Sequence, residues 1–385
     1  MQSWQLPEYI ADILPSAARQ LESAKEQLLA LYRVHGYELV CPPLLEYSQS
    51  LLTRIDEGLS LKTIRVVDQL SGRQLGLRAD ITPQVARIDA HLLSANSGLN
   101  RLCYAGSVLH ARPDGFLSTR EPLQIGAELY GHAGIDADIE LIDLMLKSLA
   151  IVNVSAPTLS LGHIGIFYAL AEAAGLDDQQ AASLLQLMQA KDASAVEKCV
   201  LQWQLSQQWI DAFIALPTLY GTQEVLQTAR TILPDLPEIS IALQQLQQIC
   251  AAFASNSIFI DLSELRVDNY HTGLLFAAYS EDWPDALARG GRYDGLGKYF
   301  GRSRPASGFS FDLRDLIGHL PPVEKLRGIK VSVHDAPAAK NEIEQLRSAG
   351  ECVIIDYTPE CNEVKGCDRQ LVWQNQQWQL IPLEQ

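Results

Sequence analysis

Strand patterns joined by loops limit the possible folds of this chain more than any other feature. Apolar runs of strand length at 102–109 and 123–130 are separated by a polar loop, and an amphipathic helical pattern follows at 136–151. Two shorter runs, at 63–68 and 74–77, flank a Ser-Gly turn. Strands joined directly by a loop pair in antiparallel fashion, whereas parallel strands need a longer crossover. We therefore expect an α/β (α+β) fold in which an antiparallel sheet is flanked by helices.

Proline and glycine mark the limits of the first helical pattern. It begins at Pro15 and ends at Gly36. The residues that share its apolar face are Leu21, Ala24, Leu28, Leu31 and Tyr32. A strand pattern at 37–41 follows and is broken by two prolines, and 82–94 reads as another helix.

A change in composition predicts how the chain is divided into domains. Residues 175–256 are rich in Gln, Leu and Ala, poor in Lys and Arg, and carry long helical patterns. We expect them to be a helical insertion in a discontinuous core formed by 1–174 and 257–322. Residues 325–385 show a β-α-β-β order and are expected to form a small C-terminal α/β domain.

Charge and cysteine usage restrict the possible partners. The 385 residues carry a formal net charge of −16 and a pI near 4.9, which counts against nucleic acid as a partner, because such binding relies on Lys and Arg. The seven cysteines form no CxxC pair, so we expect reduced thiols, no metal site and a cytoplasmic location. Neither a secretory signal nor a membrane-spanning segment is recognisable, so no membrane partner is expected.

Several residues carry groups that could bind a polar ligand, although each also has a simpler interpretation. An anion beside a hydroxyl, as in Asp80 and Thr82, suits an ammonium group, but either residue could instead cap a helix. Strand alternation places Gln124 and Glu128 on one face, which could equally be a solvated face. Aromatic hydroxyls near the glycine pair before Arg292 would suit an imidazole ring.

Six sequence motifs, which occur in the same order along the chain, resemble those of the histidyl-tRNA synthetases, a family of class II aminoacyl-tRNA synthetases. They are GYELVCPPLLE (36–46), LRADIT (77–82), QIGAE (124–128), RVDNYHTGLLF (266–276), GGRYDGL (290–296) and SGFSFDLRDL (307–316). The resemblance implies a class II synthetase-like core and a histidine-binding pocket. The histidine-binding residues that it implies are Asp80, Thr82, Arg112, Gln124, Glu128, Arg266, Tyr270, His271 and Tyr293. The chain departs from the family pattern at His271, where a second tyrosine is expected, and at Ala277, where an acid usually follows.

The same resemblance indicates that the ATP contacts are lost. Leu109 stands where the family carries an arginine that clamps the α-phosphate, and Asp315 stands where an arginine grips the γ-phosphate. An anion would repel triphosphate by roughly 1 kcal/mol at ~4 Å in water, and by more in a drier cleft. Arg314 lies one residue before the position of that arginine and on a different face of the helix, so it is a poor substitute for the γ-phosphate contact. We therefore expect no adenylation, no catalytic residue and no cofactor.

A synthetase-like chain that keeps the histidine pocket and loses the ATP contacts resembles the regulatory subunits of ATP phosphoribosyltransferase. That family implies a protein of histidine biosynthesis without catalysis of its own, which activates a short-form catalytic subunit and mediates feedback inhibition by free histidine. It also implies a homodimeric core within a hetero-octamer. For the surface that meets the catalytic subunit, we favour the core and N-terminal region over the helical insertion and the tail.

Two other functions stay open at this level. One is an active or degenerate histidyl-tRNA synthetase with divergent ATP contacts, although the tail is short and not basic enough for reading tRNA. The other is a binding module that senses histidine, tRNA or another amino acid, because His271 leaves the identity of the ligand open.

Overall fold

The computed structural model describes residues 4–51, 57–115, 118–263, 270–323, 327–358 and 366–383. The chain divides into two compact units, Met1–Pro321 and Pro322–Gln385. Among the described residues, no helix is both long enough and apolar enough to cross a membrane.

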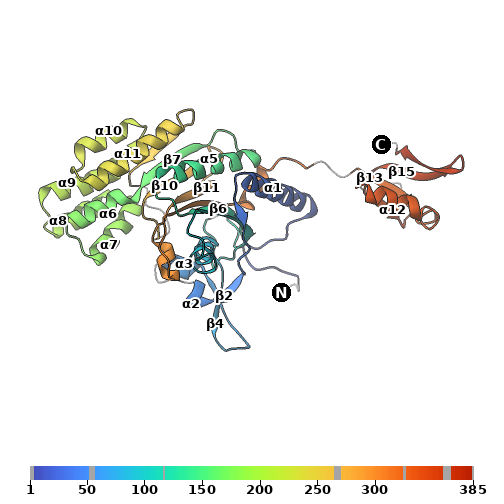
Figure 1. The fold of residues 1–385 in the computed structure, drawn as a ribbon, viewed down its shortest axis with the longest axis horizontal. Coiled ribbons are helices and arrows are strands. Elements are labelled where there is room, and N and C mark those ends of the chain that lie inside the picture. Colours follow the sequence, from blue (N-terminus) through green and yellow to red (C-terminus); the bar gives the residue numbers. More distant parts are fainter. Residues whose placement is uncertain are drawn as a thin grey trace. The chain divides into compact units, whose positions relative to one another are not determined.

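Among the described residues, a mixed sheet of nine strands forms the centre of the first unit (Figure 1). Its strands, in spatial order, are β1 (Glu38–Leu39), β5 (Asn100–Ser107), β6 (Leu123–Tyr130), β12 (Ala306–Asp312), β11 (Ala288–Arg292), β10 (Leu274–Tyr279), β7 (Thr158–His163), β9 (Ile258–Asp261) and β8 (Tyr220–Gly221). A separate small sheet has the order β2 (Leu45–Tyr47), β4 (Gln74–Leu77) and β3 (Ile64–Val67).

The expected α/β class, with a sheet flanked by helices, is confirmed, but the pairing in the sheet is mixed. Strands β5 and β6 pair in antiparallel register, as expected, from Asn100 opposite Tyr130 to Ser107 opposite Leu123. Two pairs, β1 with β5 and β7 with β9, are parallel. In both cases long stretches of chain that include helices separate the strands, which provides the crossover that parallel pairing needs.

Helix α1 (Pro15–Val34) covers the sheet as its apolar pattern predicted. Its buried side chains are Leu21, Ala24, Leu28 and Tyr32. The chain leaves the helix at Gly36, whose φ of +83° lies in the left-handed region that favours glycine. The strand that follows is shorter than expected because Pro42 and Pro43 cannot donate to a strand ladder. The helix expected at 82–94 is α4 (Thr82–Arg87), continued by a π-helical turn (Ile88–Leu92).

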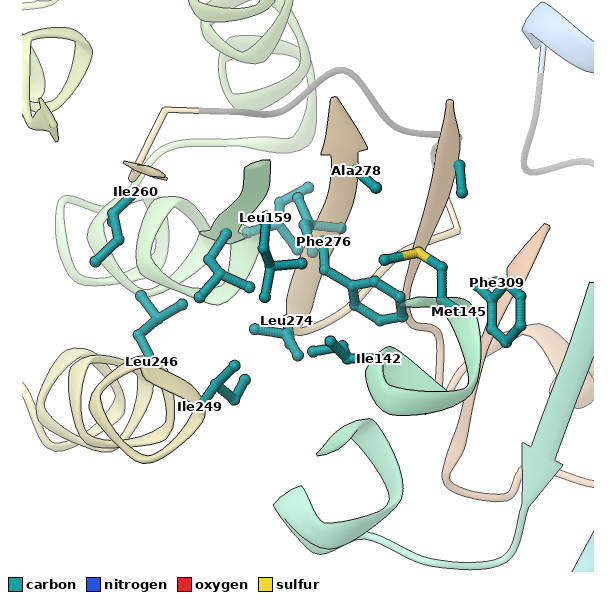
Figure 2. Packing of buried hydrophobic residues seen from close by; sticks show 14 of the residues in the cluster. Ile142, Met145, Leu159, Leu246, Ile249, Ile260, Leu274, Phe276, Ala278 and Phe309 are labelled. Carbon is teal, nitrogen blue, oxygen red and sulfur yellow. The ribbon is translucent and has the colours of Figure 1, made fainter. Parts of the chain in front are cut away.

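The main core lies between the sheet and two helices, α5 (Ile135–Ile151) and α11 (Pro237–Ala252). Figure 2 shows Ile142 and Met145 of α5 against Phe276 of β10, with Leu246 of α11 on the other side of Leu274. All five side chains are at most 3% exposed. Because one continuous core joins the sheet to both helices, the strands that carry the site are held on a rigid support.

The segment 175–256 is helical, as its composition predicted, and its helices gather at one end of the sheet (Figure 1). The helices of this region, with α6 before it, are α6 (Ile164–Ala173), α7 (Asp178–Gln189), α8 (Ala193–Gln202), α9 (Gln207–Ala215), α10 (Glu224–Ile232) and α11. A polar link joins them to the sheet, because the Lys191 Nζ donates to Asp261 Oδ2 at 2.6 Å and to Ser263 Oγ at 2.7 Å. The region therefore shares the hydrophobic core of the first unit and also has a charged contact with β9.

The second unit is a small α/β lobe with its own core. Its sheet has the order β14 (Val353–Asp356), β13 (Gly328–Ser332), β15 (Cys367–Gln374) and β16 (Gln377–Pro382), and α12 (Lys340–Ser348) completes it. The buried side chains of this core are Ile329, Val331, Ala339, Ile343, Val353 and Leu371. The chain order is β-α-β-β-β, one strand more than the β-α-β-β order expected from the sequence, because β15 and β16 form a hairpin around Asn375 and Gln376.

Candidate functional site

A cavity of about 1060 Å³ opens on the central sheet of the first unit. Its floor comes from β6 and β12, and its walls come from the segment before α4, the segment before β10 and the loop after β11. The sequence-predicted residues that line it are Asp80, Thr82, Gln124, Glu128, Tyr270, His271 and Tyr293. The fold thus brings together seven side chains from segments that are far apart in the sequence.

Asp80 is held in place by a set of hydrogen-bond donors. Gln124 Nε2 donates to Asp80 Oδ1 at 2.7 Å, and the backbone N–H of Thr82 donates to the same oxygen at 3.0 Å. Tyr270 donates its hydroxyl to Asp80 Oδ2 at 3.5 Å. Gln124 is fixed in turn, because its carbonyl oxygen accepts from the Ile81 N–H at 2.8 Å. Asp80 therefore presents a fixed negative charge to the cavity, beside the Thr82 hydroxyl.

Glu128 is a fully buried carboxyl group surrounded by hydroxyl groups. Tyr104 donates to Glu128 Oε1 at 3.0 Å, and Tyr293 donates to Oε2. Burial raises the pKa of Glu128 to about 8, and the charge of Asp80 adds to this effect. The same carboxyl also raises the pKa of Tyr293, although burial is the larger cause. Near neutral pH, Glu128 can thus exist in either protonation state within the cavity.

An aromatic wall closes one side of the cavity. The rings of Tyr270 and His271 are stacked with centroids 4.7 Å apart, and Tyr293 meets Tyr270 edge-on at 5.7 Å. Gly291 lies against this wall, and a Cβ there would come within 2.6 Å of the His271 ring. A flat ligand ring could pack here between aromatic faces.

The structure does not bring every predicted residue to the cavity. Arg112 is exposed and is not among the described residues that line it, so its predicted role in histidine binding gains no support. Arg266 lies outside the described residues. In contrast, Tyr104 and Ser310 contact the site and were not predicted. Ser310 accepts from Gln124 at 3.1 Å. Tyr104 is one of several apolar positions in an alternating strand, and no sequence signal distinguished it.

The other end of the cavity is lined by carboxyl groups. Asp312 and Asp315 both line it, and burial raises the pKa of both, with Asp315 raising that of Asp312 further, to about 7. Arg314 points to other partners, since its guanidinium donates to Glu121 Oε2 at 3.0 Å and to the carbonyl of Ala11. Leu109 is half-buried and is absent from the described lining. Two carboxyl groups thus line this part of the cavity, one of them at the position where the synthetase pattern has an arginine.

Known families and relatives match nearly the whole chain. The family described as histidyl-tRNA synthetase matches residues 9–316, and the one described as ATP phosphoribosyltransferase subunit HisZ C-terminal domain matches 326–381. The ATP phosphoribosyltransferase regulatory subunit of Neisseria gonorrhoeae is 67% identical over 93% of each chain. The chain belongs to the ATP phosphoribosyltransferase regulatory subunit family. Its counterpart from Chromobacterium violaceum is 55% identical over 99% of this chain and 100% of its own length.

Membership of the regulatory subunit family decides between the functions left open by the sequence. The prediction of a non-catalytic regulatory subunit in histidine biosynthesis is confirmed, rather than that of a working synthetase. A crystal structure titled as an ATP phosphoribosyltransferase regulatory subunit/histidyl-tRNA synthetase, from Bacillus halodurans, superposes with a TM-score of 0.81 at 25% identity, over 94% of this chain and 95% of its own. The histidyl-tRNA synthetase of Nostoc superposes with a TM-score of 0.75 over 96% of this chain and 91% of its own; at 17% identity it shows the shared fold alone.

Proposed function

We propose that this regulatory subunit associates with a short-form catalytic subunit of ATP phosphoribosyltransferase, activates it, and binds free histidine in the cavity on the central sheet. The contrast between the two ends of the cavity carries this proposal. One end has Asp80, Thr82 and Glu128 arranged for an ammonium and an imidazole, and the other end has Asp312 together with Asp315, which stands where the synthetase pattern has an arginine. A sensor of free histidine needs the first end and has no use for phosphate contacts.

The proposal extends to assembly through the N-terminal part of the core. Leu39, Leu44 and Leu45 follow α1 and are 52%, 41% and 43% exposed. Exposed apolar side chains within one short stretch of chain suit an interface with a second copy of the chain. The proposed assembly is a homodimeric core that joins catalytic subunits in a hetero-octamer of four chains of each kind.

Reconstitution with a short-form catalytic subunit tests the regulatory role. Phosphoribosyl transfer from phosphoribosyl pyrophosphate to ATP is measured with and without this chain, and then with added histidine. We expect co-elution of the two subunits, faster transfer on mixing, and a rate that depends on histidine. No co-elution and no change in rate would refute the proposal.

Calorimetry on the isolated chain tests the ligand site separately. Histidine is expected to bind the wild type, and Asp80→Asn is expected to weaken binding by about tenfold, because a charge-assisted hydrogen bond to an ammonium contributes roughly 1.5–3 kcal/mol. Lys298→Met, at a residue that is not among the described lining of the cavity, serves as the control. Histidine-dependent exchange between ATP and pyrophosphate would point instead to a synthetase, and we expect none.

A further inference from the structure

One phenolic hydroxyl connects two groups of the cavity without belonging to its lining. Tyr104 is fully buried on β5 and is absent from the described residues that line the cavity. Its hydroxyl donates to Glu128 Oε1 at 3.0 Å and lies 3.1 Å from Thr82 Oγ1. Both Thr82 and Glu128 do line the cavity, so Tyr104 contacts from behind the two groups that a ligand would meet.

The backbone around Tyr104 and Glu128 leaves room for this arrangement. A Cβ at Gly126 would lie 2.7 Å from the Tyr104 hydroxyl oxygen, and a Cβ at Gly308 would overlap Glu128 Oε2. Because side chains at these two strand positions would displace the phenol or the carboxyl, glycine keeps both groups where they are. The hydrogen-bonded set formed by Thr82, Tyr104 and Glu128, which we call the hydroxyl relay, therefore has a defined geometry.

The proton on Glu128 decides the direction of the hydroxyl relay, because each hydroxyl has a single proton to donate. When Glu128 is ionised, Tyr104 donates to it, and Thr82 can donate to Tyr104 or to the carboxylate. The lone pairs of Thr82 then face the cavity. When Glu128 is protonated, it can donate to Tyr104, Tyr104 can donate to Thr82, and the Thr82 proton turns toward the cavity. An ammonium ligand needs acceptors, so the first arrangement, in which both lone pairs of Thr82 are free, suits it better.

We infer that Tyr104 is a positioning residue, which makes the binding of an amino-acid ammonium group at Thr82 depend on whether Glu128 carries a proton. The inference rests on the proposed histidine site. It adds to that site a link between ammonium recognition at Thr82 and the protonation state of the Glu128 carboxyl group.

Other ionisable groups also face Glu128, so their effects on binding have to be distinguished from the effect of the hydroxyl relay. They are Asp80 before α4, Tyr130 on β6 itself, Tyr293 after β11 and, beyond the Tyr293 ring, His271 before β10. Strand β12 places Gly308 opposite the carboxyl group. Of the tyrosines, Tyr130 is the matched control, since its hydroxyl lies 3.3 Å from that of Tyr293 and forms no hydrogen bond with Thr82.

A mutant cycle measured at two pH values tests the inference. Histidine affinity is measured by calorimetry for wild type and Thr82→Val at about pH 6.5 and about pH 8.5, on either side of the pKa of about 8 of Glu128. The same pair is measured in a Tyr104→Phe background and in a Tyr130→Phe background. Valine has the shape of threonine without its hydroxyl, so purely Coulombic effects of pH cancel within each pair.

We expect Thr82→Val to weaken binding by about tenfold at the higher pH and by much less at the lower pH. This dependence of the Thr82→Val effect on pH should persist in the Tyr130→Phe background and be largely lost in the Tyr104→Phe background. If the effect of Thr82→Val on affinity changes equally with pH in all three backgrounds, the inference is overturned. It is also overturned if this effect does not change with pH in the wild-type background. A wild type that binds no histidine at all would instead refute the proposed site itself. If Tyr104→Phe fails to fold, Thr82→Ser replaces it in the test. This variant keeps the hydroxyl and should therefore keep the pH dependence of the wild type. Loss of that pH dependence in Thr82→Ser would contradict the hydroxyl relay.

Discussion

Gly308 faces Glu128 across two paired strands of the sheet. The register of β12 and β6 places the two residues opposite each other, with no space for a side chain at position 308. We expect Gly308→Ala to displace the Glu128 carboxyl and to weaken histidine binding strongly, since overpacking a buried site costs roughly 1–3 kcal/mol.

Calorimetry checks the effect of Gly308→Ala, with Gly318→Ala as its matched control. A Cβ at Gly318 would meet no atom within 4 Å, so this variant should bind histidine like the wild type. Unchanged binding in Gly308→Ala would mean that the position of Glu128 does not matter for the ligand.

The buried carboxyl group of Glu128 should also affect stability. Its pKa is raised from an ordinary 4.5 to about 8 by burial, so between these values the folded protein keeps a proton that the unfolded chain releases. The free energy of unfolding should then fall by about 1.4 kcal/mol per pH unit as pH rises through this window. Glu128→Gln removes this contribution and should raise the melting temperature more at about pH 8 than at about pH 5.

Glu140 provides a control of opposite sign for the stability measurement. Its hydrogen bonds with Arg101 lower the pKa of the Glu140 carboxyl, so its stabilising effect is present above the ordinary pKa and is lost as pH falls through the lowered one. Glu140→Gln should therefore destabilise the protein at neutral pH. If both variants shift the melting temperature in the same direction at about pH 8, the protonation state assigned to Glu128 is wrong.

At the scale of elements, one lysine forms a charged contact between the helical region and the sheet. Lys191, in the turn between α7 and α8, is paired with Asp261 at the end of β9, and the two side chains are 31% and 11% exposed. Lys191→Met leaves the buried Asp261 without its cationic partner. We expect a loss of about 1–2 kcal/mol in the free energy of unfolding, measured with urea.

Lys198→Met is the matched control for the Lys191 prediction. Lys198 lies on the neighbouring helix α8 and is exposed, so its replacement should change stability very little. Equal urea midpoints for the two variants would show that the ion pair adds nothing to the attachment of the helices.

The extent of each element follows from local chemistry in some places and from tertiary contacts in others. The limits of β4 and β6 agree with the strand patterns read from the sequence, because alternation and turn residues act locally. The expected helix at 82–94 changes to a π-helical turn at Ile88, where Asp89 is buried against Arg304 and Asn100. A partner more than 200 residues away in sequence cannot be read from a local pattern.

At the scale of the whole molecule, the proposed ligand site belongs to the first unit alone. Every described residue that lines the cavity lies within Met1–Pro321, and the second unit has its own core. A chain that ends at Pro321 should therefore fold and bind histidine with unchanged affinity. Calorimetry together with circular dichroism checks this, and a folded truncated chain that binds no histidine would place part of the site in the second unit.

The sequence alone determined the class of fold and the residue types at both ends of the cavity. Alternation, turn residues and the ordered motifs are local signals, so they predicted the hairpin of β5 and β6, the helix α1 and the carboxyl group at Asp315. Only the tertiary structure decided that Tyr104 lies behind Thr82 and Glu128, and that Arg112 is exposed and is not among the described residues that line the cavity. The physical reason is that hydrogen bonds and burial depend on which strands lie side by side. That arrangement is set by packing across the whole sheet rather than by neighbours in the chain.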